Sequence, residues 1–139
     1  MEGSYLLDTD AFSYAVSGRS DQMRQQLGAS AGKLALSAIS LAELRYGVQK
    51  KGSRRLASLV DLFLELVSVV DFDSLAAERY AGIRTQLERA GTPIGANDML
   101  IAAVALSKGY TLVTNNTSHF GRIKGLKLVN WAEDLNVRQ

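Results

Sequence analysis

The hydrophobic residues of this chain fall into short apolar runs that alternate with amphipathic stretches. The run at 5–7 predicts a strand that ends at Asp8, and a helix capped by Asp10 should follow it. The same succession of strand and helix recurs along the chain. We expect strands at about 5–7, 34–36, 67–72, 110–114 and 126–131, and helices at about 11–16, 40–49, 53–67, 74–90 and 97–107, with a short turn around Phe120.

The most regular helical pattern begins after Ser53. Six apolar residues recur there at a spacing of three or four positions and form one broad face of a helix. They are Leu56, Leu59, Val60, Phe63, Leu64 and Val67. We expect this face to pack on the core, and the alternative is that it binds a helix of a partner protein.

Strands that alternate with helices predict a three-layer α/β/α fold. The sheet should be mainly parallel, with four to five strands, and helices should cover both of its faces. We expect the whole chain, residues 1–139, to form one domain. In parallel sheets ligands bind at the carboxyl ends of the strands, so the residues that follow each strand are the first candidates for a site.

Composition narrows the possible chemistry. The 139 residues include no cysteine, which excludes thiolate catalysis and cysteine-bound zinc. The single histidine, His119, cannot supply within one chain the two-histidine acid–base pair of metal-free ribonucleases. A net charge of +2 permits a nucleic-acid partner without indicating one. The sequence shows no secretory signal and no apolar run long enough to span a membrane, so we expect a cytoplasmic protein.

Three carboxylates fall at comparable places in this pattern. Asp8 directly follows the first strand, Glu43 lies in the first turn after the second, and Asp98 lies at the start of the alanine-rich helix at 97–107. Thr114 and Asn116 follow a fourth strand. Because parallel strands place their carboxyl ends at one edge of the sheet, these side chains should form a cluster.

Such a cluster predicts a bound cation. Two carboxylates about 4 Å apart repel by roughly 4 kcal/mol at an effective dielectric constant near 20, and three would repel more. A site with oxygen ligands alone suits Mg²⁺ or Mn²⁺. The chemistry that follows is hydrolysis of a phosphodiester by a metal-bound water.

Each acid also has a purely structural explanation. Asp8 could cap a helix, although Asp10 is the better candidate, and Asp98 would stabilise a helix N-terminus wherever it lay. The sequence Ser40-Leu41-Ala42-Glu43 fits a capping box, so Glu43 could be a cap. For His119 we expect a place on the surface, and the alternative is contact with RNA or with a metal-bound water.

Five strings, which are spread along nearly the whole length of the chain, resemble the VapC family of PIN-domain ribonuclease toxins. They are LLDTD at 6–10, SAISLAELRYG at 37–47, GTPIGANDMLIAA at 91–103, LVTNN at 112–116 and GLKLVNW at 125–131. The resemblance implies a Mg²⁺- or Mn²⁺-dependent endoribonuclease and a toxin homodimer. It also implies a VapB-like antitoxin whose C-terminal segment wraps the toxin and occupies its active-site groove.

The resemblance also assigns roles to individual residues. Asp8, Glu43 and Asp98 match the family's acidic metal-site residues, and Thr114 matches the hydroxyl residue beside them. Many PIN domains have a fourth acid where this chain has Asn116, so the site of this chain carries one negative charge fewer. The GTPIG and TNN strings resemble enteric VapC toxins, whose substrate is the initiator transfer RNA.

Basic residues that could contact RNA occur in two groups. The first is Lys50, Lys51, Arg54 and Arg55, and the second is Arg122 and Lys124. The alternative for both groups is that these side chains are exposed to solvent and bind nothing.

Two other functions compete with the nuclease. LLDTD also resembles the Asp-x-Asp of haloacid-dehalogenase-type phosphotransferases, with Asp8 as nucleophile and Asp10 as acid, although Phe12 does not fit that motif. The second alternative is a PIN fold that binds RNA or protein without turnover, which Asn116 keeps open.

Overall fold

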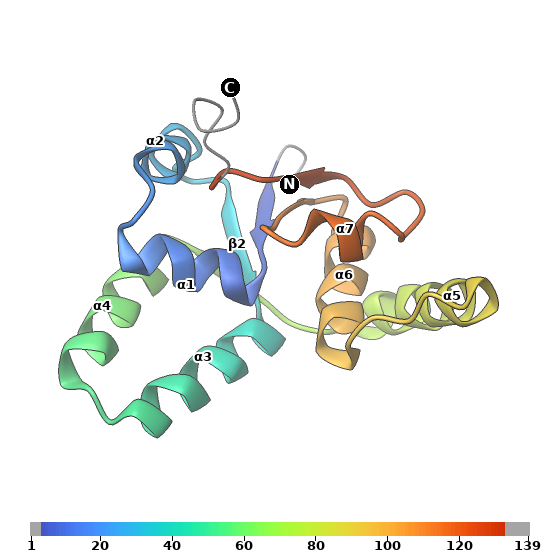
Figure 1. Ribbon diagram of the computed structural model, residues 1–139, viewed down its shortest axis with the longest axis horizontal. Coiled ribbons are helices and arrows are strands. Elements are labelled where there is room, and N and C mark those ends of the chain that lie inside the picture. The colour runs from blue at the N-terminus through green and yellow to red at the C-terminus, as the bar shows by residue number, and fades with distance from the viewer. Residues whose placement is uncertain (1–3, 133–139) are drawn as a thin grey trace.

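The computed structural model describes residues 4–132 (Figure 1). Its five strands form one parallel sheet. The strands are β1 (Tyr5–Leu7), β2 (Leu34–Ser37), β3 (Ser68–Val70), β4 (Thr111–Val113) and β5 (Leu128–Val129). The helices are α1 (Thr9–Ser17), α2 (Asp21–Ala29), α3 (Ala38–Lys51), α4 (Arg54–Leu64), α5 (Ser74–Ala90), α6 (Ala96–Lys108) and α7 (Thr117–Phe120).

The strand order β3-β2-β1-β4-β5 places the first strand of the chain at the centre of the sheet. Leu7, the last residue of β1, pairs with Leu36 of β2 on one side and with Val113 of β4 on the other. The three central strands therefore end at almost the same level, and the residues that follow them share one edge of the sheet.

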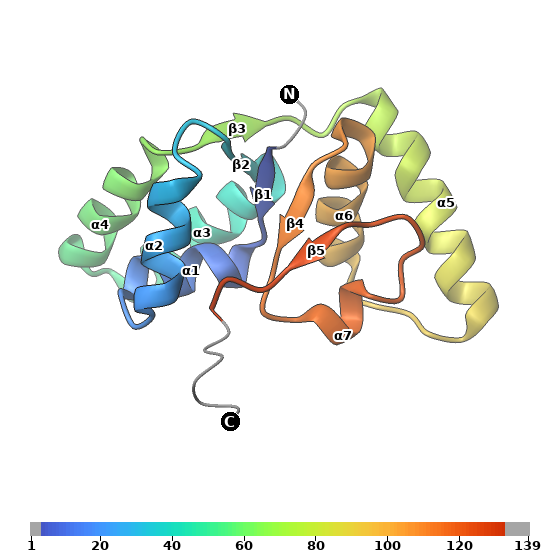
Figure 2. The same ribbon diagram turned by 90° about the horizontal axis from the view of Figure 1, so that it is seen from above.

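Helices cover both faces of the sheet, as the view in Figure 2 shows. Leu6 and Leu112 point to the face covered by α5 and α6, whereas Leu7 and Val113 point to the face covered by α1 to α4. This alternation follows from the two-residue period of a strand, and it explains why the central strands β1, β2 and β4 are largely apolar. The predicted three-layer α/β/α fold is confirmed.

The helix α6 lies at the centre of one layer, as its alanine-rich composition predicts. Its residues from Ala102 to Ala105 are all inaccessible to solvent. The face of α4 also packs on the core, with Val60 buried and Phe63 against the same cluster. Within residues 4–132, neither α6 nor any other helix combines the length and the apolar character needed to cross a membrane.

Three elements differ from the prediction. The helix α2 was not expected, because among its nine residues only Met23 is buried and the apolar pattern is weak. The strand β3 is shorter than the expected 67–72, and β5 is reduced to two residues of the expected 126–131. All three differences lie away from the carboxyl ends of β1, β2 and β4.

Candidate active site

The carboxyl ends of β1 and β4 bring Asp8 and Thr114 together. The backbone N–H of Asp8 donates to the carbonyl of Val113 at 3.0 Å, which fixes the two strand ends side by side. The hydroxyl of Thr114 then donates to Oδ2 of Asp8 at 2.5 Å. Both residues are almost inaccessible to solvent, with exposed fractions of 4% for Asp8 and 0% for Thr114.

Asp8 is also the N-cap of α1. Its Oδ1 accepts a hydrogen bond from the backbone N–H of Ala11 at 2.7 Å. The expectation that Asp10 caps this helix is therefore wrong: α1 begins at Thr9, so Asp10 lies in its first turn and is exposed. One carboxylate serves both the helix and the cluster, since each of its oxygens accepts a different bond.

Burial sets the charge state of Asp8. Loss of hydration raises the pKa of its carboxyl group from 3.8 to about 6, although the bonds from Thr114 and Ala11 act in the opposite direction. The negative charges of Asp10 and Asp98 raise this pKa further. Asp98, in the first turn of α6, also has a raised pKa, because of burial and of the charges of Glu43 and Asp10. Four acidic side chains thus act on one another at this edge.

Glu43 reaches the same edge from the second turn of α3, not from the first. The helix begins at Ala38 because Ser37 is extended and its hydroxyl accepts from the backbone N–H of Ile39 at 3.0 Å. Ser40 is then inside the helix and fully buried. The capping box that Ser40 and Glu43 could have formed is therefore absent, and the structural explanation for Glu43 is wrong.

Two side chains from other helices hold the carboxylate of Glu43. The hydroxyl of Thr9 in α1 donates to Oε1, and the side-chain amide of Asn97 in α6 donates to Oε2 at 3.0 Å. The hydroxyl of Ser40 lies 3.0 Å from that of Thr9. The sequence prediction missed Thr9, Ser40 and Asn97. The available signal was position, because Thr9 and Asn97 are the immediate neighbours of Asp8 and Asp98.

Asn116 joins the site through its backbone, because its N–H donates to the hydroxyl of Thr114 at 2.9 Å. Its side chain lies 3.0 Å from the ring of His119. His119 belongs to α7 and is partly exposed, which is consistent with the expected place at the surface.

The donor set fits a hard divalent cation held by two carboxylates. Within residues 4–132, no three acidic or histidine side chains lie close enough to enclose one ion. None of the ion pairs there involves Asp8, Glu43 or Asp98, so no lysine or arginine balances their charge. Mg²⁺ commonly takes one or two carboxylates and completes its shell with water. Asp8 and Asp98 could supply these two, with Glu43 acting through water.

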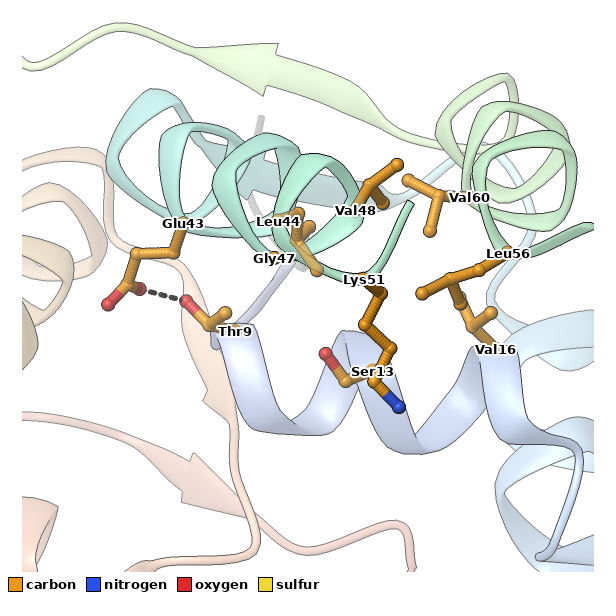
Figure 3. Close-up of a pocket in the computed structure, with 10 residues that line it drawn as sticks. All are labelled: Thr9, Ser13, Val16, Glu43, Leu44, Gly47, Val48, Lys51, Leu56 and Val60. Atoms are coloured by element: carbon orange, nitrogen blue, oxygen red, sulfur yellow. Dashed lines mark hydrogen bonds between the residues drawn. The ribbon is translucent and has the colours of Figure 1, made fainter. Parts of the chain in front are cut away.

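A groove of ≈ 290 Å³ extends from this edge between α1 and α3 (Figure 3). Thr9 and Glu43 lie at one end and Leu56 lies at the other, with Lys51 between them. Most of the remaining lining is apolar: Val16, Leu44, Gly47, Val48 and Val60, with Ser13.

The six candidate RNA-binding residues are all exposed, and they lie in different places. Lys51 is the one that lines the groove with Glu43. Lys50, Arg54 and Arg55 are near it, at the end of α3 and the start of α4. Lys124 lies beside Arg89 of α5, and a guanidinium nitrogen of Arg122 lies 3.5 Å from the carbonyl of Pro93.

Comparison with known proteins gives consistent matches over nearly the whole chain. Residues 5–126 match the PIN domain. Ribonuclease VapC2 of Rickettsia felis is 42% identical over 130 residues, which are 91% of this chain and 97% of that protein. The tRNA(fMet)-specific endonuclease VapC of Shigella flexneri is 33% identical over 129 residues, which are 92% of this chain and 98% of that protein.

Solved structures with the same fold also come from VapC proteins. DNA-bound VapBC from Salmonella typhimurium contains a chain that is 34% identical and superposes with a TM-score of 0.86, over 92% of this chain and 98% of that one. VapBC2 from Rickettsia felis, bound to a DNA fragment from its promoter, contains one that is 40% identical with a TM-score of 0.84, over 91% and 98%.

Proposed function

This chain belongs to the PIN-domain family and within it to the VapC ribonucleases, and from that premise we propose that it cleaves RNA with a divalent cation held by Asp8 and Asp98. One observation carries the proposal: Asp8 and Asp98 reach the same edge of the sheet from β1 and α6, and their charges have no basic partner in the described part of the chain. Mutual repulsion of this kind is relieved by a cation.

The other side chains have supporting roles in this proposal. Thr114 fixes the orientation of the Asp8 carboxylate by its hydrogen bond to Oδ2. Thr9 and Asn97 fix Glu43, which then faces the cation through water and can accept a proton from an attacking water molecule. When bound, Mg²⁺ or Mn²⁺ would lower the pKa of a coordinated water and neutralise charge on the scissile phosphate.

For the substrate we propose transfer RNA, and specifically the initiator transfer RNA. The support is the similarity to the Shigella flexneri relative, which is a tRNA(fMet)-specific endonuclease. Cleavage of this RNA would stop translation, and the cytoplasm would be the place of action.

The test is to incubate the purified protein with total transfer RNA and Mg²⁺ and to sequence the new 5′ ends. We expect one dominant cut, which chelation by EDTA prevents and Mg²⁺ or Mn²⁺ restores. Binding without any cut in either ion would contradict the nuclease and support a PIN fold that has lost turnover.

The groove between α1 and α3 suggests how activity is controlled. The solved structures similar to this chain include VapBC toxin–antitoxin complexes. We propose that a segment of a VapB-like antitoxin lies in the groove, with apolar side chains against Val48 and Val60 and a basic side chain near Glu43. We further propose that the toxin is a homodimer, as the family resemblance implies.

A larger side chain at position 47 would fill the groove and leave the rest of the fold unchanged. A Cβ added at Gly47 meets no atom within 4 Å, so a larger side chain is free to enter the groove without disturbing α3. Gly47→Leu should weaken antitoxin binding by about tenfold or more, which is 1.4 kcal/mol. Gly47→Ala is the matched control, with a small effect on binding and a gain of about 0.5–1 kcal/mol in helix stability.

Isothermal titration with the antitoxin's C-terminal peptide measures both variants. Equal affinity for the parental protein and Gly47→Leu would place the antitoxin elsewhere.

A further inference from the structure

Hydrogen bonds through Asn116 and Thr114 connect the imidazole of His119 to Asp8 of the candidate active site. Its Nδ1 lies 3.0 Å from the side-chain nitrogen of Asn116. The backbone N–H of Asn116 donates to Thr114 at 2.9 Å, and Thr114 donates to Asp8 at 2.5 Å. The ring is therefore positioned by the same strand end that positions Asp8.

The hydrogen bonds of Asn116 also favour one position for the proton of the ring. The hydroxyl of Ser118 donates to Oδ1 of Asn116 at 3.4 Å, which directs the amide NH₂ of Asn116 towards His119. An NH₂ group can only donate, so Nδ1 of His119 accepts. The neutral ring then carries its hydrogen on Nε2. Within residues 4–132, Nε2 has no hydrogen-bond partner.

The surroundings of His119 are acidic. Burial and the charges of Glu43 and Asp10 raise the pKa of Asp98, and the ring of His119, when it is protonated, lowers it. Asp8, Glu43 and Asp98 make no ion pair with any lysine or arginine of the described chain. A phosphodiester that approaches these acids meets repulsion, and a hydrogen-bond donor beside them would offset it.

We propose that His119 binds the substrate directly, through a hydrogen bond from Nε2–H to a non-bridging oxygen of an RNA phosphate beside the acidic cluster. This inference rests on the proposed function, because it assigns RNA to the site. It adds a substrate-binding residue that supplies a donor where the carboxylates can only accept. The amide of Asn116 acts through His119 and is a positioning group.

The experiment measures RNA binding without cleavage. A short fluorescein-labelled single-stranded RNA is titrated in EDTA by fluorescence anisotropy, with the parental protein and with His119→Ala, His119→Gln and His119→Asn. Gln carries an amide near the position of Nε2, whereas Asn reaches only the position of Nδ1. We expect Kd to rise about tenfold, which is 1.4 kcal/mol, in the Ala and Asn variants, and less than about threefold in the Gln variant.

Circular dichroism and thermal unfolding first confirm that each variant is folded. Parental affinity in His119→Ala would overturn the proposal, as would a Gln variant as weak as the Ala variant. So would failure of the parental protein to bind the RNA at all. Titration of Mn²⁺ in the absence of RNA should give the same affinity for the parental protein and His119→Ala, and a weaker affinity in the variant would make His119 a metal ligand and overturn the proposal.

These readouts are independent of turnover. If the parental protein binds RNA and cleaves none in Mg²⁺, the proposed nuclease function fails, while the comparison of the His119 variants still decides the phosphate contact.

Discussion

Asp98→Asn should reduce RNA cleavage by at least about 10²–10³-fold, the size found when one electrostatic group is removed from an active site. Asparagine keeps the shape of the side chain and removes the charge that would hold a cation. Asp8→Asn should have the same effect, since Asp8 is the other carboxylate proposed as a cation ligand. Initial rates of cleavage of the labelled initiator transfer RNA, at saturating Mg²⁺, measure both losses.

Asp10→Asn is the matched control. Asp10 is exposed in the first turn of α1, two residues from Asp8, and the same substitution there should leave the rate within about threefold, because surface charges interact weakly. A haloacid-dehalogenase-type mechanism would need Asp10 as its acid, but the match to the PIN domain over residues 5–126 excludes that reading. Parental cleavage by both Asp8→Asn and Asp98→Asn would refute the proposed site.

The second large effect is a dependence of stability on pH. Asp8 has a folded pKa of about 6 and an unfolded pKa of 3.8, so the folded state binds its proton more tightly. This contribution to stability is fully present below pH 3.8 and is lost as pH rises through 6. The difference corresponds to about 3 kcal/mol, since one pKa unit is about 1.36 kcal/mol.

Asp8→Asn should therefore be more stable than the parental protein at about pH 7.5, by up to about 3 kcal/mol, and similar to it at about pH 4. Asparagine still accepts the capping bond from Ala11, so the helix keeps its start. Urea unfolding at both pH values, without divalent cations, measures the difference. The same stability difference at both values would contradict the raised pKa.

Asp73→Asn provides a control of opposite sign. Asp73 caps α5, and its bonds from Ala76 and Lys108 lower the pKa of its carboxyl group. It therefore stabilises the fold above its unfolded pKa, and this contribution is lost as pH falls. The cost of the substitution should be larger at about pH 7.5 than at about pH 4.

The sequence was sufficient to place the acids that directly follow strands or begin a helix. The apolar run before Asp8 and the run before Thr114 mark where β1 and β4 end, and parallel pairing then requires the two residues to meet. Asp98 was placed by the start of the buried helix α6. The helix α2 could not be predicted in this way, because an amphipathic pattern requires more buried residues than Met23 alone.

The environment of Glu43 could not be predicted, because it depends on tertiary contacts. Ser37 and Ser40 are both suitable caps, and the choice is made by β2, which extends through Ser37 to pair with Val70 of β3. The partners of Glu43 are 34 and 54 residues away in the chain. The local sequence pattern around Glu43 cannot predict contacts with residues so far away in the chain.

The central position of β1 has a consequence for protein synthesis. Asp8 leaves the ribosome well before Thr114, which holds its carboxylate and is 106 residues further along the chain. Because β4 lies directly beside β1, a nascent or truncated polypeptide that ends before β4 lacks the strand on one side of β1 and the Thr114 hydroxyl that binds Asp8. Domains form as units during translation. The acidic site is therefore complete only after β4 has been synthesised, which leaves time for a neutralising partner to be present first.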